Sequence, residues 1–422
     1  MVNQAGGDER IRSRQSLAYL RLPLVLCVFL AAPACAERPT VKTPGWVGTW
    51  AAAPQLPEPH NVPPPPGVAG STLRQVARVS AGGDRVRVRL SNEFGRDSLT
   101  LEGRIALSGG GSSILPATDR ALTFSGKTLV TIPAGAPMLS DPLEMHLEPL
   151  ASVAITLFVS EAPADITSHP GSRCTSYLQE GRHLAAWELP EAVKVEHWYL
   201  LSGIDVYSGT ASGAVAVLGD SITDGRGSTT DQNRRWTDFL AERLSEDSEV
   251  GVLNLGMGGN RVLQDGLGPN ALARLDRDVL ARSGVRWLIV LEGINDIGTA
   301  DLGTSVEISA LVERLTGAYE QIIERARSHG IAVVGGTLLP FEGSFYFTPE
   351  REAVRRAVNE WIRTAGRFDE VVDFEQATRD PARPGHLLPD LDCGDHLHLN
   401  DLGYRTMAEA ANRVIRSHLG SN

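Results

Sequence analysis

The stretch AVAVLGDSITDG, from Ala214 to Gly225, decides the fold of the second half of the chain. Its first five residues are all apolar, which is typical of a strand buried on both faces of a parallel sheet. A glycine and several polar residues follow at once, and a helical pattern begins at Trp236. A strand that leads through a tight turn into a helix is the repeating unit of α/β proteins. Because such sheets carry their sites at the carboxyl ends of the strands, we expect chemistry at Ser221.

Four more buried strands are expected downstream, each separated from the next by a helical pattern. One helix is expected to carry the apolar positions from Ile308 to Ile323, and a last one starts near Asn400. Strands that alternate with helices in this way indicate a parallel sheet. The four further strands are expected at residues 250–255, 286–291, 331–334 and 371–374.

Besides the segment at Ser221, polar or glycine-rich segments follow the strands expected at 250–255 and 286–291. A fourth such segment lies near the C-terminus. Gly256 to Asn260 reads GMGGN, Glu292 to Asp296 reads EGIND, and Asp392 to Asn400 reads DCGDHLHLN. Since the ends of parallel strands meet at one edge of a sheet, these segments are expected to converge with Ser221 on one crevice.

The converging residue types suit acyl transfer. A serine hydroxyl such as that of Ser221 becomes a nucleophile when a base removes its proton. His398 is the candidate base, and Asp395, three residues earlier, is the candidate group that orients it. The backbone around Gly259 and the side-chain amide of Asn295 are candidate donors to the oxyanion that forms on the attacked carbonyl.

Each element also has a simpler interpretation. Ser221 could cap the helix that follows, and the Asn295-Asp296 pair could form an Asx turn. His396 and His398 could be part of a metal site, although no third ligand stands at a recognisable spacing. The occurrence of all the elements at successive strand ends favours a hydrolytic site over these alternatives.

The four segments resemble, in order, the four sequence blocks of the GDSL/SGNH hydrolases. The resemblance extends from about Gly213 to Leu419. The run GDSITDGRGS, followed by NRRW at Asn233 to Trp236, is similar to the arylesterase/acylhydrolase subfamily found near xylanase genes. That subfamily often has a β-rich N-terminal region that begins with a motif such as GTWAAAP, here Gly48 to Pro54.

The resemblance implies a flavodoxin-like three-layer α/β/α domain without metal or organic cofactor. It implies that Ser221 is the nucleophile, that His398 is the base and that Asp395 orients His398. The backbone N–H groups of Ser221 and Gly259 and the side chain of Asn295 would form the oxyanion hole. Gly259 is chosen among the loop glycines because it directly precedes a polar residue.

The implied function is that of an exported serine esterase that hydrolyses carboxylic esters through an acyl-serine intermediate. The subfamily resemblance favours short acyl or acetyl groups, including carbohydrate-linked ones. The alternatives are a lipase, thioesterase or acyltransferase that acts on longer acyl chains, and a non-catalytic glycan-binding protein.

The first half of the chain has a different pattern. From about Gly45 to Ser208, apolar residues fall on every second position, as in RVRVRL at Arg85 to Leu90. This period, with frequent turn signals, predicts a β-sandwich, jelly-roll-like domain. Its aromatic side chains could stack on sugars or could pack in the core. The aromatic residues considered are Trp46, Trp50, Trp198 and Tyr199.

The first 36 residues have the pattern of a signal peptide. Arginines precede an apolar run from Leu22 to Ala32, and small residues follow at Ala34 to Ala36. An uncleaved anchor and a lipoprotein modified at Cys35 are the alternatives. The predicted organisation is therefore a signal peptide at 1–36, a β-rich accessory domain at 37–210 and a hydrolase domain at 211–422, with a secreted, periplasmic or cell-envelope location.

Composition limits the partners. The chain has 422 residues, 42% of them hydrophobic, and a formal net charge of −11, which gives no attraction to nucleic acid. We expect a small-molecule or polysaccharide ester as substrate and no stable membrane insertion after cleavage of the signal. Two cysteines lie outside the leader, Cys174 and Cys393, and in an oxidising compartment they could form a disulfide or remain buried thiols.

Overall fold

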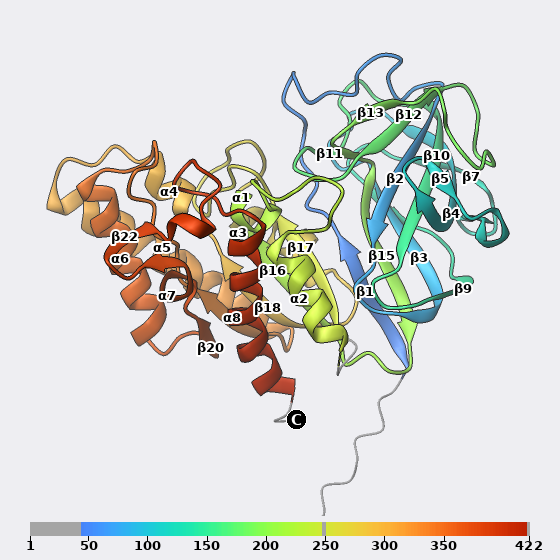
Figure 1. Cartoon of the computed structure of the whole chain (residues 1–422). Coiled ribbons are helices and arrows are strands. Elements are labelled where there is room, and N and C mark those ends of the chain that lie inside the picture. Colours follow the sequence, from blue (N-terminus) through green and yellow to red (C-terminus); the bar gives the residue numbers. More distant parts are fainter. Residues whose placement is uncertain (1–43, 247–249, 420–422) are drawn as a thin grey trace, which may run out of the picture. The chain divides into compact units, whose positions relative to one another are not determined.

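The computed structural model describes residues 44–246 and 250–419. The predicted signal peptide, residues 1–36, lies outside the described residues. The described residues all belong to one compact unit, which contains a β-rich region and an α/β region. In Figure 1 the β-rich region runs from blue to green and the α/β region from yellow-green to red.

A five-stranded parallel sheet organises the α/β region, as predicted. The strands are ordered β17-β16-β18-β19-β20. In chain order this is 2-1-3-4-5, which is the arrangement of flavodoxin-like sheets. The strands are β16 (Ala214–Gly219), β17 (Gly251–Gly256), β18 (Val285–Leu291), β19 (Ala332–Gly336) and β20 (Glu370–Val372).

Helices connect these strands. The longest, α5, is capped by Thr304, whose side chain accepts the N–H of Glu307 while the Glu307 carboxylate accepts the N–H of Thr304. This capping box satisfies donors that the first helical turn leaves free. The helices are α1 (Ser221–Asp224), α2 (Trp236–Ser245), α3 (Ala271–Leu275), α4 (Ile294–Gly298), α5 (Ser305–Ser328), α6 (Pro349–Thr364), α7 (Phe374–Thr378) and α8 (Asp401–Leu419).

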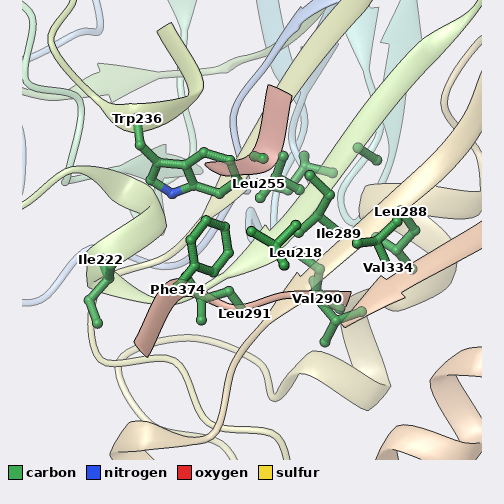
Figure 2. Packing of buried hydrophobic residues seen from close by; sticks show 14 of the residues in the cluster. Leu218, Ile222, Trp236, Leu255, Leu288, Ile289, Val290, Leu291, Val334 and Phe374 are labelled. Carbon is green, nitrogen blue, oxygen red and sulfur yellow. The ribbon is translucent and has the colours of Figure 1, made fainter. Parts of the chain in front are cut away.

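The core of this region lies between the sheet and its helices. Figure 2 shows the ring of Trp236 from α2 beside the ring of Phe374 from α7, with sheet residues such as Leu218 next to them. The two rings meet edge to face with centroids 5.4 Å apart, and both side chains are fully buried. This packing anchors the start of α2 and the start of α7 to the middle of the sheet.

Two antiparallel sheets form the β-rich region. Apolar side chains from both sheets, among them Val86, Val88, Leu73 and Ile155, belong to one buried cluster. The predicted β-rich region is therefore confirmed, while its jelly-roll topology stays a prediction. One sheet holds β1 (Gly45–Ala51), β15 (Leu201–Ser208), β3 (Gly83–Ser91), β8 (Pro137–Leu139) and β9 (Leu143–Leu147). The other holds β13 (Val193–Val195), β12 (Ser176–Glu180), β2 (Ser71–Arg78), β10 (Ser152–Glu161), β4 (Leu99–Gly110), β5 (Ser113–Ile114), β6 (Arg120–Ala121) and β7 (Leu129–Ile132).

Two small two-stranded pairs complete the strands. One joins β11 (Ser168–His169) to β14 (Trp198–Tyr199) in the β-rich region. The other joins β21 (Arg379–Asp380) to β22 (Arg383–Leu387) before the last helix. The first pair matters for the site because it places His169 beside Trp198.

The two regions share a tightly packed contact between β1 and β17. A Cβ atom on Gly251 would lie 2.0 Å from the carbonyl oxygen of Gly48, so only glycine fits at that point. The N–H of Gly48 donates to the carbonyl of Ser283 at 2.8 Å, and the N–H of Val252 donates to Ser80 Oγ at 2.8 Å. Backbone groups of the β-rich region and of the α/β region are thus hydrogen-bonded to each other's residues.

The aromatic residues considered as sugar platforms are mostly in the core. Trp50, Trp198 and Tyr199 are buried, and Trp50 meets Trp198 edge to face. The sugar-stacking interpretation is therefore wrong for these three residues. Trp46 is half-buried, and the guanidinium of Arg87 lies 4.3 Å from the centre of its ring.

The structure does not contain the considered Cys174–Cys393 disulfide, since both are free thiols. The Cys174 thiol is directed at the carbonyl of Val76, 3.5 Å away. Cys393 is exposed, and its side chain lies against Gly227. The two side chains thus have different neighbours.

No helix in the described ranges has the length and apolar character needed to span a bilayer.

Candidate active site

Ser221 opens the one-turn helix α1 at the end of the central strand β16. Asp220 caps this turn, because its carboxylate accepts the N–H of Ile222 at 2.9 Å. A Cβ on Gly219 would lie 2.1 Å from Thr223 Oγ1, and one on Gly256 would lie 2.2 Å from the backbone nitrogen of Asp224. The two glycines let both neighbouring strand ends approach the turn closely, and this fixes the position of Ser221.

The predicted serine, histidine and carboxylate come together. Ser221 Oγ lies 2.7 Å from His398 Nε2, and His398 Nδ1 lies 2.7 Å from Asp395 Oδ2. Because a carboxylate only accepts hydrogen bonds, Nδ1 carries the proton in this arrangement, and Nε2 is left to accept the serine proton. Ser221 keeps 9% of its surface exposed, whereas His398 keeps 2%.

The carboxylate of Asp395 is held in its charged form. Burial alone raises its pKa, but the hydrogen bonds from the ring and the backbone N–H of His398 outweigh burial and bring the pKa well below the ordinary value. The same carboxylate also accepts the N–H of Leu397 at 3.0 Å. Asp395 is therefore ionised at neutral pH and can stabilise a positive charge on His398.

The two histidines of the DCGDHLHLN segment point to different partners. His396 Nδ1 lies 2.6 Å from Asp392 Oδ2, whereas the His398 ring lies between Asp395 and Ser221. The interpretation of the pair as a metal site is therefore wrong. Within the described ranges, the one group of three side chains close enough to share an ion is Asp392, Cys393 and Asp395. Their carboxylates are already occupied by the two histidines and by loop N–H groups.

Gly259 lies in the glycine-rich loop that follows β17. Gly259 has a φ of +66°, which favours glycine, and Asn260 follows it. The Asn260 side chain is fully buried; its amide donates to the carbonyl of Pro269 and its oxygen accepts from Arg274 Nε. The Asn260 carbonyl accepts the side-chain amide of Asn295 at 2.9 Å. The loop and Asn295 are thus connected directly.

Three donors are available at this point. In the part of the chain that the structure describes, the backbone N–H groups of Ser221 and Gly259 have no acceptor. Asn295 uses one of its two amide hydrogens on the Asn260 carbonyl and keeps the other. A tetrahedral oxyanion requires unpaired hydrogen-bond donors of this kind.

Behind the site lies a buried cluster of charged groups around Arg274. Its guanidinium contacts Glu292 at 3.2 Å and Asp278 at 3.1 Å, and it also donates to the carbonyls of Gly219 and Leu255. Arg274 therefore ties together the ends of β16, β17 and β18. Burial raises the pKa of Glu292 well above its ordinary value and that of Asp220 to about 7.

One contact from the β-rich region reaches the helical turn that carries Ser221. His169 Nε2 lies 2.9 Å from Asp224 Oδ1, and His169 Nδ1 lies 2.9 Å from the carbonyl of Ala53. The His169 ring also stacks on Trp198, with centroids 5.6 Å apart. Asp224 is the last residue of α1, so the β-rich region supports the helical turn that carries Ser221.

Sequence reasoning missed His169, Arg274 and Tyr346. Tyr346 OH lies 3.0 Å from Asn295 Oδ1, although it comes from a turn 51 residues away. No periodicity marks such a residue. Asp224 stands inside the GDSITDG motif, but the motif gives no indication that its partner lies in the first half of the chain.

A serine, a histidine and an aspartate at the strand ends of a parallel α/β sheet are an arrangement that one class of hydrolases uses. Residues 217–406 match the model of the GDSL-like lipase/acylhydrolase family. This part of the chain is therefore similar to the GDSL-like lipases and acylhydrolases.

Similar solved structures include two whose descriptions name an activity. An acetylxylan esterase from Geobacillus stearothermophilus shares 20% identity over 49% of this chain and 95% of its own, with a TM-score of 0.37. A GDSL-like lipase from Bacteroides thetaiotaomicron shares 19% identity over 49% of this chain and 89% of its own, with a TM-score of 0.35. A comparison with curated proteins found no match.

Proposed function

We propose that the protein is a serine esterase that hydrolyses carboxylic esters through an acyl-Ser221 intermediate. The observation that carries the proposal is the continuous contact from Ser221 Oγ to His398 Nε2 and from His398 Nδ1 to Asp395, with both distances 2.7 Å. In this proposal Ser221 is the nucleophile, His398 the general base and acid, and Asp395 the group that orients His398.

In the first half of the reaction, Ser221 Oγ attacks the ester carbonyl and its proton passes to His398 Nε2. The carbonyl oxygen becomes an oxyanion that receives hydrogen bonds from the N–H groups of Ser221 and Gly259 and from the Asn295 amide. When this intermediate collapses, the bond to the alcohol oxygen breaks and the alcohol leaves with the proton from His398. The acyl group stays on Ser221.

In the second half, water attacks the acyl carbonyl. Its proton passes to His398, and the same three donors stabilise the second oxyanion. Collapse releases the carboxylic acid, and the proton returns from His398 to Ser221 Oγ. The reaction consumes one ester and one water and produces one alcohol and one acid.

Short acyl groups, acetyl above all, are the proposed substrates, and a carbohydrate is the proposed alcohol part. This finer proposal rests on the similarity of the GDSITDGRGS and NRRW segments to the arylesterase/acylhydrolase subfamily. Export to the cell envelope or medium is proposed on the pattern of residues 1–36. Mass analysis of the protein recovered outside the cytoplasm would test both the export and the cleavage after Ala36.

A series of p-nitrophenyl esters from acetyl to palmitoyl tests the proposal, with the Ser221→Ala variant as the matched control. The proposal expects hydrolysis that is fastest with acetyl and lost in Ser221→Ala. Rates that rise with chain length would replace the short-acyl proposal with one of lipid substrates. Full activity of Ser221→Ala would overturn the role of Ser221, and an inactive but folded protein would favour glycan binding without catalysis.

A further inference from the structure

We infer that Tyr346 is a positioning residue for the oxyanion hole, because its hydroxyl fixes the orientation of the Asn295 amide. This inference rests on the proposed function. Tyr346 lies in the turn between β19 and α6, and Asn295 lies in α4. The Tyr346 hydroxyl is 3.0 Å from Asn295 Oδ1.

The hydrogen bonds determine which way the Asn295 amide points. The backbone carbonyl of Asn260 can only accept, so the atom of Asn295 that faces it at 2.9 Å is the amide nitrogen. The amide oxygen then faces Tyr346, and the Tyr346 hydroxyl must donate to it. Burial raises the pKa of Tyr346, so the hydroxyl keeps the proton that this bond needs.

The surroundings of Tyr346 are built to hold its ring at α4. A Cβ on Gly298 would lie 2.3 Å from the Tyr346 ring, so the ring packs directly on the helix backbone three residues after Asn295. The carbonyl of Tyr346 accepts from Arg351 Nη1 at 2.9 Å, and Arg351 Nη2 donates to the carbonyl of Ala300 at 2.8 Å. Arg351 thereby ties the turn to the segment that follows α4.

This arrangement has a consequence for the reaction. With its oxygen held by Tyr346 and one hydrogen held by Asn260, Asn295 has one hydrogen left, and that hydrogen is available to the oxyanion. A donor to the amide oxygen also polarises the amide and strengthens its N–H as a donor. Tyr346 therefore acts on the transition state through Asn295 and does not need to touch the substrate.

The test is a double-mutant cycle measured on p-nitrophenyl acetate with the whole protein. Tyr346→Phe removes only the hydroxyl and should lower kcat about tenfold, with KM changed by less than about twofold. Asn295→Ala should lower kcat by about 100-fold or more. If Tyr346 acts through Asn295, adding Tyr346→Phe to Asn295→Ala should cause no further loss.

A second readout uses phenylboronic acid, whose boron accepts the Ser221 oxygen and becomes tetrahedral. Tyr346→Phe should weaken its inhibition by about the same factor as it lowers kcat. Arg351→Gln leaves the hydroxyl but releases the turn, so it should cause a smaller loss of kcat that also vanishes in the Asn295→Ala background. This variant keeps the test valid if Tyr346→Phe does not fold.

Tyr199→Phe is the matched control, since it removes a hydroxyl that donates at 3.0 Å to the carbonyl of Asn61 in the β-rich region. Its kcat should equal that of the wild type. An unchanged kcat in Tyr346→Phe, a change confined to KM, or a loss that adds fully to Asn295→Ala would overturn the inference. Those results with an active wild type would leave the proposed function standing, whereas an inactive wild type would overturn the proposed function itself.

Discussion

His169 of the β-rich region and Asp224 of the helical turn that carries Ser221 form a buried pair, with Nε2 and Oδ1 2.9 Å apart. The His169 side chain is 5% exposed and that of Asp224 is 4% exposed. Each His169 nitrogen faces an oxygen, one from Asp224 and one from the carbonyl of Ala53. The β-rich region is therefore part of the support of the candidate active site.

Loss of His169 should destabilise the protein through Asp224. His169→Leu leaves a buried carboxylate without this partner, which costs about 1–3 kcal/mol of unfolding free energy. Urea unfolding of His169→Leu, Asp224→Asn and the double variant measures the coupling between the two residues. The double variant should lose less stability than the two single losses combined. A strictly additive loss would show that the pair contributes nothing beyond its separate packing.

The contacts from Ser221 to His398 and from His398 to Asp395 predict that Asp395→Asn loses activity without loss of structure. The amide of asparagine can hold His398 in the wrong tautomer, with Nδ1 as acceptor and Nε2 protonated, so that His398 no longer accepts the Ser221 proton. We expect kcat to fall by about 10³-fold to 10⁴-fold. The exposed Asp390, five residues before Asp395, offers a control, and Asp390→Asn should behave as the wild type. A loss below about tenfold in Asp395→Asn would contradict the assigned role.

The pKa of Asp220 predicts how stability changes with pH. Burial raises its folded pKa from 3.8 to about 7, so the folded protein keeps a proton that the unfolded chain releases above about pH 4. The unfolding free energy therefore falls as the pH rises through this window. Asp220→Asn removes the titration and should keep the cap on Ile222. The measured quantity is the melting temperature of the variant minus that of the wild type. This difference should be larger near pH 8 than near pH 5, and a difference that does not change with pH would contradict the prediction.

Arg274 should be one of the most sensitive positions in the chain. Its side chain is fully buried between Asp278 and Glu292 and donates to two strand-end carbonyls. Arg274→Met removes the charge but keeps much of the volume, and it leaves the buried acids short of a partner. We expect a loss of about 3–5 kcal/mol in unfolding free energy. The exposed Arg286→Met is the control, and equal melting curves for both variants would refute the expectation.

The two free thiols can be counted directly. Mass analysis of the protein after alkylation with iodoacetamide, in denaturant and without reductant, should find both Cys174 and Cys393 modified. Addition of dithiothreitol should leave the melting temperature unchanged. Recovery of both cysteines unmodified until reductant is added would restore the disulfide.

The parallel sheet and the convergence of its polar ends could be predicted from the sequence. The runs that form β16 to β20 are short and apolar, and a glycine-rich or polar segment follows directly at Ser221, at Gly259 and at Asn295. Parallel strands bring such segments to one edge. This accounts for the position of Ser221. The prediction that His398 and Asp395 join it rests on the chemistry of a serine–histidine–aspartate site and on the resemblance of the four segments.

The contacts around these residues could not be predicted. The Tyr346–Asn295 and His169–Asp224 bonds join residues that are 51 and 55 positions apart in the chain, a separation to which no helical or strand period applies. The sequence around the aromatic residues of the β-rich region does not distinguish a sugar-stacking side chain from a core side chain. The packing of Trp50 on Trp198 in the structure makes that distinction. A disulfide likewise depends on the distance and direction of two side chains, which spacing does not determine.

The central claim is that Ser221 is the nucleophile activated by His398, and covalent labelling tests it most directly. A fluorophosphonate loses fluoride when an activated serine oxygen attacks its phosphorus, and the adduct can be located by peptide mass analysis. The account predicts one adduct on the peptide that contains Ser221 and none in Ser221→Ala or His398→Ala. An adduct on another serine, or none in a folded wild type that hydrolyses p-nitrophenyl acetate, would contradict it.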